Sequence, residues 1–172
     1  MKGALPQAAR AAGLRPEPAS PSQQSSIPNA GLVELVERGA KPSAALDREI
    51  ALAVGWHRYS PSEIGRKNPG WIAPEDFIGE YVRGDGRRTP KLDSLHGTDI
   101  WREPRPYSTS IDAAMTLVPP GHIFGCGSKD ATGTAWAWSG PADPLEYRSI
   151  SNAATPALAL CAAALKAKGE NQ

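Results

Sequence analysis

The sequence predicts an α+β fold, a layered helix–sheet sandwich in which three to four helices pack on an antiparallel sheet of about five strands. The first indication is a pair of helices in the C-terminal half with clear start signals, near Thr109 and at Thr155. The second is a series of short stretches between these helices that read as strands joined by turn residues. The length of 172 residues is enough for one domain and an arm.

The composition excludes several classes of protein. The net charge is +1, so the chain lacks the strongly basic surface of a protein that coats nucleic acid. No apolar run approaches the roughly 18 residues that a membrane-spanning helix needs, and the first residues contain no hydrophobic block typical of a secretory signal. We therefore expect a cytoplasmic protein without membrane contact, in which Cys126 and Cys161 are reduced, buried thiols.

The chain divides into an arm, one domain and a short tail. Residues 1–28 are rich in Pro, Ser, Gln and Ala and almost free of large apolar side chains. Such a segment cannot bury enough surface to offset its ordering entropy, so we expect an arm that is disordered or ordered only by a partner. Residues 29–168 are expected to form the α+β domain, and residues 169–172 a disordered tail.

Two helices open the domain. An amphipathic pattern predicts a helix over residues 31–38, which Gly39 ends. Ser43 then offers its hydroxyl as the N-cap of a second helix over residues 44–54. Because only a few residues join these helices, we expect them to pack as a hairpin.

Glycine and proline interrupt the middle of the domain, residues 57–106, so only short strands are expected there. Extended runs lie at residues 56–59, 77–82 and 90–92. Residues 83–86 have the composition of a hairpin turn that joins the last two runs.

The third predicted helix starts with a hydroxyl at Thr109 and a carboxylate at Asp112, the spacing of a capping box. The sequence Pro-Pro-Gly at residues 119–121 ends this helix. The residues expected on its inner face are Ile111, Ala114, Met115 and Val118.

Three strands and a final helix complete the domain. The strands are expected at residues 122–126, 134–139 and 145–150, and residues 127–133 read as the hairpin loop between the first two. Thr155, followed by proline, is the expected N-cap of the last helix. The rest of this helix is nearly all Ala and Leu, so it must be largely buried.

The spacing of three segments resembles the phage ABA-sandwich domain family, small proteins of bacterial viruses and prophages. The similar segments are residues 46–56 (LDREIALAVGW), 107–119 (YSTSIDAAMTLVP) and 155–166 (TPALALCAAALK), and the resemblance spans about residues 30–168. The middle segment, residues 93–101, is longer than in the compact members. The resemblance implies a viral or prophage origin and a helix–sheet layered fold, but no catalytic residues.

Trp136 and Trp138 alternate with alanine along one predicted strand, so both indoles project from the same face. Two arrangements are open. The expected one packs this face under the helices, with the indoles in the core. The other leaves the face open, and the two indoles with Arg148 on the next strand would then form a platform for a planar ring and an anionic group.

Two further candidate ligand contacts lie in loops. Arg87 and Arg88 form a basic pair on a predicted turn, which is either a solvated tip or a phosphate contact. Trp101 lies in a segment rich in Gly and Pro, where it is expected as a lid over a small apolar cluster or, alternatively, as a ligand contact.

The loop that holds Ser94, His96 and Asp99 has a catalytic interpretation. His96 would act as a general base, oriented by a carboxylate, on Ser94 as the nucleophile. The glycines of a nucleophile elbow are missing around Ser94, and Ser and Asp are ordinary turn residues. A hydrogen-bonded loop is therefore the simpler expectation.

No metal and no cofactor are expected. The His and Cys residues are scattered without the spacing of zinc ligands. Gly125 and Gly127 precede a predicted strand instead of the helix that a phosphate loop needs, so they read as part of a hairpin turn.

The predicted function is therefore binding, not catalysis. We expect a phage or prophage accessory protein that evades host defence by binding a host protein or by holding a small nucleotide ligand, the latter as a homo-oligomer. One alternative is a structural or assembly protein of the virion, with residues 1–28 as an extended arm. Another is a small hydrolase that uses residues 93–99.

Overall fold

The computed structural model describes residues 27–85, 87–91, 101–128, 133–143 and 148–169. Within these ranges the chain forms five α-helices and three antiparallel sheets of two, two and three strands. The helices are α1 (Asn29–Glu37), α2 (Ala44–Ala53), α3 (Pro61–Ile64), α4 (Ile111–Met115) and α5 (Pro156–Gly169), with one 3₁₀ turn, η1 (Pro74–Asp76). The strands are β1 (His57–Tyr59), β2 (Gly70–Ile72), β3 (Glu80–Val82), β4 (Arg88–Pro90), β5 (His122–Ser128), β6 (Ala135–Pro141) and β7 (Ser149–Ala153).

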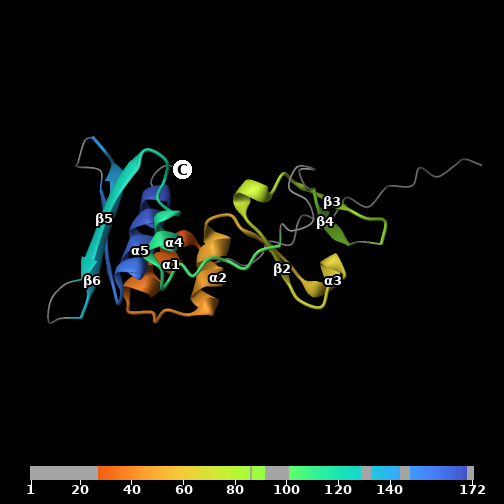
Figure 1. The fold of residues 1–172 in the computed structure, drawn as a ribbon, viewed down its shortest axis with the longest axis horizontal. Coiled ribbons are helices and arrows are strands. Elements are labelled where there is room, and N and C mark those ends of the chain that lie inside the picture. The colour runs from red at the N-terminus through yellow and green to blue at the C-terminus, as the bar shows by residue number, and fades with distance from the viewer. Residues whose placement is uncertain (1–26, 86, 92–100, 129–132, 144–147, 170–172) are drawn as a thin grey trace, which may run out of the picture.

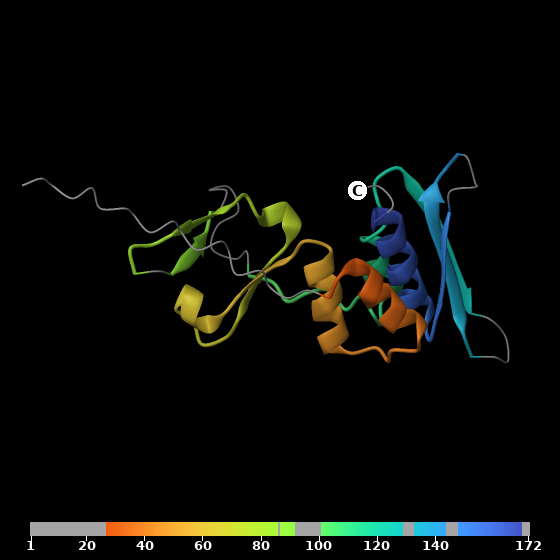
Figure 2. The ribbon, with the colours of Figure 1, turned by 180° about the vertical axis from the view of Figure 1, so that it is seen from behind.

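These elements are arranged along one long axis (Figures 1 and 2). The sheet β5–β6–β7 lies at one end, and α5 packs along one of its faces. The helices α1, α4 and α2 follow beyond α5, and the sheets β1–β2 and β3–β4 with α3 form the other end. The α+β class is confirmed, but the strands expected in one sheet of about five are distributed over three sheets, because β1 pairs with β2 and β3 with β4.

The last helix, α5, is the centre of the hydrophobic core. Its residues from Ala157 to Leu165 are buried on all sides, as the run of Ala and Leu predicts. No helix in the part of the chain that the structure describes is both long and apolar enough to cross a membrane. The inner faces of β6 and β7, which contact α5, carry the small residues Ala135, Ala137, Ser139, Ser149, Ser151 and Ala153.

Small side chains on both partners bring α5 and the sheet close together. The other side of α5 is covered by α1 and α4. Lys166 connects α5 to α1 and β7. Its Nζ lies 2.6 Å from Oε1 of Glu37 in α1 and donates a hydrogen bond to the carbonyl of Ile150 in β7 at 2.9 Å. The helix α1 thus packs mainly against α5, and less against α2.

The strands of the three-stranded sheet extend further than their sequence signals. β5 and β6 each continue two residues beyond the predicted ends, and β7 runs from Ser149 to Ala153 instead of ending at residue 150. The buried positions of β7 are Ser149, Ser151 and Ala153, which alternate with exposed residues. These side chains are small, so the hydrophobic pattern of the sequence did not reveal them.

The predicted N-caps at Ser43 and Thr155 are confirmed. The Oγ of Ser43 accepts a hydrogen bond from the N–H of Leu46 at 3.2 Å, and Oγ1 of Thr155 accepts one from the N–H of Leu158 at 3.2 Å. Each hydroxyl satisfies one of the N–H groups that the first turn of a helix leaves free.

The helix α4 begins one residue later than predicted. Ser110, and not Thr109, is the N-cap, and its Oγ accepts a hydrogen bond from the N–H of Ala113 at 3.2 Å. The buried face of α4 also differs from the predicted one by one position, which corresponds to a rotation of about 100° around the helix axis. The buried residues are Ala113, Ala114 and Leu117, and the exposed residues include Ile111 and Met115 of the predicted inner face.

The segment Tyr107-Ser108 joins α2 to α5. Ser108 is fully buried, and its N–H donates to Oδ1 of Asp47 in α2 at 2.6 Å. Its Oγ accepts from the N–H of Ser43 at 3.2 Å, and its carbonyl accepts from Oγ1 of Thr155 at 3.4 Å. One residue therefore bonds to the N-caps of both helices.

The neighbouring Tyr107 extends this network in two directions. Its hydroxyl oxygen accepts a hydrogen bond from Nε1 of Trp56, just after α2, at 3.0 Å. Its carbonyl accepts one from the thiol of Cys161 in α5 at 3.3 Å. Both ends of α2 are thus fixed to the same short segment.

We expect Asp47→Ala to lower the free energy of unfolding by about 2–3 kcal/mol, because the buried N–H of Ser108 loses a charged acceptor. Chemical denaturation with urea measures this difference. The matched control is Arg48→Ala, the next residue of the same helix, which is exposed and should change stability by less than about 0.5 kcal/mol. Equal effects of the two substitutions would contradict the role of Ser108 as a junction.

Candidate functional site

One face of the sheet β5–β6–β7 carries no helix in the described part of the chain (Figures 1 and 2). We call it the outer face, and its residues are Ile123, Gly125, Gly127, Trp136, Trp138, Arg148, Ile150 and Asn152. Trp136 and Trp138 are half-buried there, while the alanines between and before them are buried against α5. The indoles therefore do not pack under the helices as expected, because the inner face of β6, which packs on α5, carries alanine and serine.

The two indoles pack on glycines of the neighbouring strand, β5. The register places Gly125 opposite Trp138 and Gly127 opposite Trp136. A Cβ atom at Gly125 would lie 2.7 Å from Nε1 of Trp138, and one at Gly127 would lie 3.0 Å from Cζ2 of Trp136. The distance at Gly125 is too short for a side chain, and the distance at Gly127 would require the indole to shift slightly, so each indole occupies the space that a glycine leaves open.

This seating corrects the sequence interpretation of the two glycines. Neither is part of a hairpin turn: Gly125 lies within the predicted strand, and Gly127 lies inside β5 and not in the loop predicted from residue 127. Glycine normally weakens a strand because it has no side chain to pack, but an aromatic side chain on the paired strand can cover it. The pattern Gly-x-Gly opposite Trp-x-Trp thus holds two large aromatic groups in defined positions.

Arg148 adds a positive charge to this surface. Its guanidinium carbon lies 3.8 Å from the ring centroid of Trp138, in cation–π contact. It is the one charged side chain on the outer face among the residues that the structure describes. The sequence-predicted group Trp136, Trp138 and Arg148 is therefore brought together, with exposed Ile123 and Ile150 beside it.

The other predicted contacts lie at the opposite end of the molecule. Trp101 packs on the small core of Tyr59 and Ile72, with its ring edge-on to Tyr59 at 5.9 Å. Arg87 is exposed and pairs with Asp85 at 3.6 Å. A small cavity of about 100 Å³ has Arg87 and Trp101 among its lining residues.

Three predicted residues lie outside what the structure describes. Ser94, His96 and Asp99, the weak catalytic candidates, belong to the segment 92–100. The backbone of Arg88 is part of β4, but its side chain is not described.

The two thiols differ in their exposure to solvent. Cys161 is completely buried, and Cys126 is partly exposed on β5; neither forms a disulfide. Burial, with a smaller contribution from the charge of Asp47, raises the pKa of Cys161 from its ordinary value of 9.0 to about 12. Among the described residues, no three His, Cys, Asp or Glu side chains gather as metal ligands would.

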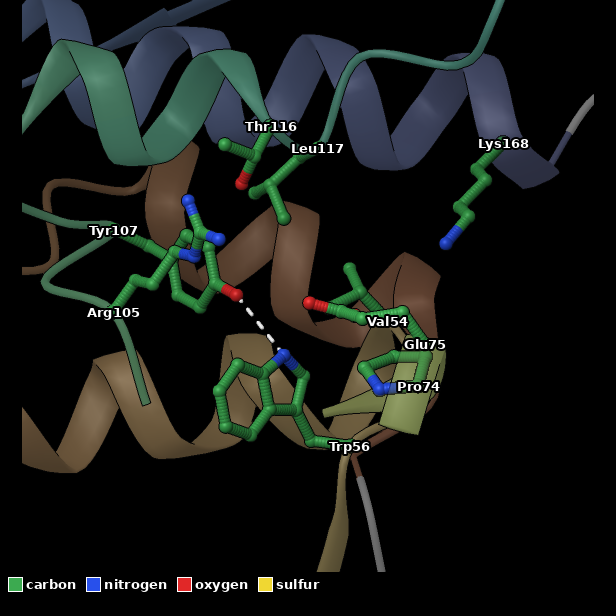
Figure 3. Close-up of a pocket in the computed structure, with 9 residues that line it drawn as sticks. All are labelled: Val54, Trp56, Pro74, Glu75, Arg105, Tyr107, Thr116, Leu117 and Lys168. Atoms are coloured by element: carbon green, nitrogen blue, oxygen red, sulfur yellow. Dashed lines mark hydrogen bonds between the residues drawn. The ribbon is translucent and has the colours of Figure 1, made fainter. Parts of the chain in front are cut away.

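A cavity of about 380 Å³ lies on the other side of α5, away from the outer face (Figure 3). The residues with polar groups that line it are Trp56, Glu75, Arg105, Tyr107, Thr116 and Lys168. The sequence reading missed it, because these residues come from separate segments and no local motif connects them. No family model, curated protein or solved structure matches this chain.

We expect Gly125→Ala to destabilise the protein by about 1–3 kcal/mol, because its methyl group must displace the indole of Trp138. Urea denaturation measures the loss, and near-ultraviolet circular dichroism reports the changed indole environment. Gly84→Ala is the control, since a Cβ there meets nothing within 4 Å. If both variants retain the stability and the spectrum of the parent protein, the close contact between Gly125 and the indole of Trp138 is contradicted.

The buried thiol of Cys161 predicts a loss of stability in alkali. The unfolded thiol ionises near its ordinary pKa of 9.0, whereas the folded thiol stays neutral up to a pKa of about 12. Between these values the unfolded state binds fewer protons, so the free energy of unfolding should fall by up to about 1.4 kcal/mol per pH unit. Urea denaturation at several pH values should show a shallower fall in Cys161→Ala; parallel slopes would argue against a buried neutral thiol.

Proposed function

We propose that this chain is a non-enzymatic binding protein that docks a protein partner on its outer face. The observation that supports this proposal is the pair of indoles that pack on glycines of a sheet face, which no helix of the described ranges covers. A sheet face that carries large aromatic side chains is ordinarily covered, and exposed apolar patches mark interaction sites. A partner on this face would complete a layered sandwich around the sheet.

The composition of the outer face favours a protein over a small molecule. Small ligands bind in concave sites, whereas the outer face is one side of an open sheet with Ile123 and Ile150 exposed beside the indoles. Tryptophan and arginine are the residues that most often dominate the energy of protein interfaces. Packing on the glycines limits the motion of the indoles, which lowers the entropy cost of ordering these side chains when a partner binds.

The charge of the outer face indicates the partner's chemistry. Arg148 stacks on Trp138 and has no acidic neighbour on this face among the described residues. A partner with a carboxylate beside an apolar or aromatic side chain would pair with the guanidinium while covering the indoles.

The biological setting is part of the same proposal. The resemblance to the phage ABA-sandwich domain family supports a phage or prophage accessory protein that binds a host protein in the cytoplasm, as an inhibitor of host defence. A structural or assembly role in the virion is the alternative, in which the outer face would meet a virion protein.

Site-specific photo-crosslinking in bacterial cells distinguishes these partners. A photoreactive residue replaces Ile150, at the outer face, or Leu35, which is exposed on α1 and serves as the control. We expect position 150, but not position 35, to yield one discrete adduct with a host protein. The purified partner should then bind Trp138→Ala or Arg148→Gln at least about tenfold more weakly, the loss expected for an interface anchor.

Four outcomes would contradict the binding of a host protein on the outer face. No adduct at position 150, or equal adducts at both positions, would remove the outer face as a docking surface. An adduct with twice the mass of the chain would identify a second copy as the occupant, and an adduct with a virion protein would favour the structural role.

A further inference from the structure

The cavity in Figure 3 has a rigid aromatic floor. Trp56 and Tyr107 are both buried, and the hydrogen bond from Nε1 of Trp56 to the hydroxyl oxygen of Tyr107 measures 3.0 Å. Val54 and Leu117 add apolar contacts to the lining. A planar ring is the group that such walls accommodate best.

Tyr107 offers a hydrogen-bond donor that no described residue uses. Its hydroxyl oxygen accepts the bond from Trp56, and no residue in the described ranges accepts the hydroxyl hydrogen. Tyr107 is 2 % exposed, and buried polar groups are normally paired. An acceptor atom of a ligand in the cavity would satisfy this donor.

Two cations and one carboxylate surround the opening. Arg105 and Lys168 line the cavity, and neither side chain has an ion pair or hydrogen bond with the rest of the described chain. Glu75 lies among them. Burial raises the pKa of Tyr107, while Arg105 acts to lower it and Glu75 to raise it, so both charges lie near the phenol.

The helix ends limit the charge that the cavity can accept. Val54 follows the C-terminus of α2, and Lys168 belongs to the last turn of α5. The carbonyl ends of helices carry partial negative charge, which disfavours a multiply charged anion. Arg105 and Lys168 carry two positive charges and Glu75 carries one negative charge. The net charge of these three side chains is therefore +1, which suits a ligand with a single negative charge.

We propose that this cavity binds a small planar organic monoanion, with its anionic group at Arg105, Lys168 and the hydroxyl of Tyr107 and its ring against the aromatic floor. The volume of about 380 Å³ falls in the usual range of small-ligand sites, about 300–1,000 Å³. The site does not depend on the outer face, because α5 separates the two.

The probe is 2-naphthoate, a planar aromatic carboxylate, compared with its neutral and cationic analogues 2-naphthylmethanol and 2-naphthylmethylammonium. Isothermal titration calorimetry should show saturable binding of the carboxylate and at least about tenfold weaker binding of the alcohol and the amine. The indole N–H resonance of Trp56, assigned with Trp56→Phe, should shift during the titration because Trp56 forms the floor of the site.

Four variants locate the binding. Arg105→Gln and Lys168→Gln should each weaken 2-naphthoate by about tenfold or more, the effect of losing a hydrogen bond to a charged group. Arg48→Gln, on the exposed side of α2, is the matched control for charge, and Arg148→Gln controls for binding at the outer face. Circular dichroism confirms that each variant is folded.

Absence of saturable binding, or equal affinity for the carboxylate and the alcohol, would overturn the proposal. Binding that survives both Arg105→Gln and Lys168→Gln but is lost in Arg148→Gln would assign the probe to the outer face instead. Because the crosslinking at Ile150 uses a different surface, either proposal can fail without the other.

Discussion

The hydrogen bonds of Tyr107-Ser108 are the constraint on which the arrangement of the helices depends. This segment lies in no helix or strand, yet it bonds to both ends of α2, to the N-cap of α5 and to the thiol inside α5. Backbone groups buried in a turn must find partners, and here they find them on elements that are far apart in the sequence. The segment also carries Tyr107, whose phenol forms part of the cavity floor, so the same bonds position the helices and the cavity.

A second constraint, the close approach of α5 to the sheet, decides where the aromatic side chains go. Alanine and serine on the inner faces of β6 and β7 leave no space for an indole between helix and sheet. Since side chains alternate along a strand, small residues inside require Trp136 and Trp138 outside. The glycines of β5 then give these indoles a place to lie. The exposed aromatic surface is thus the consequence of a tightly packed interior.

The two surfaces on either side of α5 suit different classes of partner. In the described part of the chain, the outer face is an open, aromatic sheet surface with one cation, which matches the composition of protein interfaces. The cavity has a buried aromatic floor, a hydroxyl hydrogen that no described residue accepts, and charges at its opening, which match the composition of small-ligand sites. The helix between them is buried on all sides, so a ligand on one side does not contact a partner on the other.

The sequence by itself determined the elements whose signals are local. The hydroxyls of Ser43 and Thr155 marked two helix starts, and the Ala/Leu run marked a buried helix, because a cap or a continuous apolar run needs only neighbouring residues. Local signals failed at α4, where either of two adjacent hydroxyls could serve as the cap and where packing against α5 decided which face is buried. They also failed for the sheet, because strand pairing joins residues distant in sequence. Only the tertiary structure decided which face of β6 was covered, that Gly125 lies beneath Trp138, and that Arg105 and Lys168 meet at one cavity, since each depends on packing between separate segments.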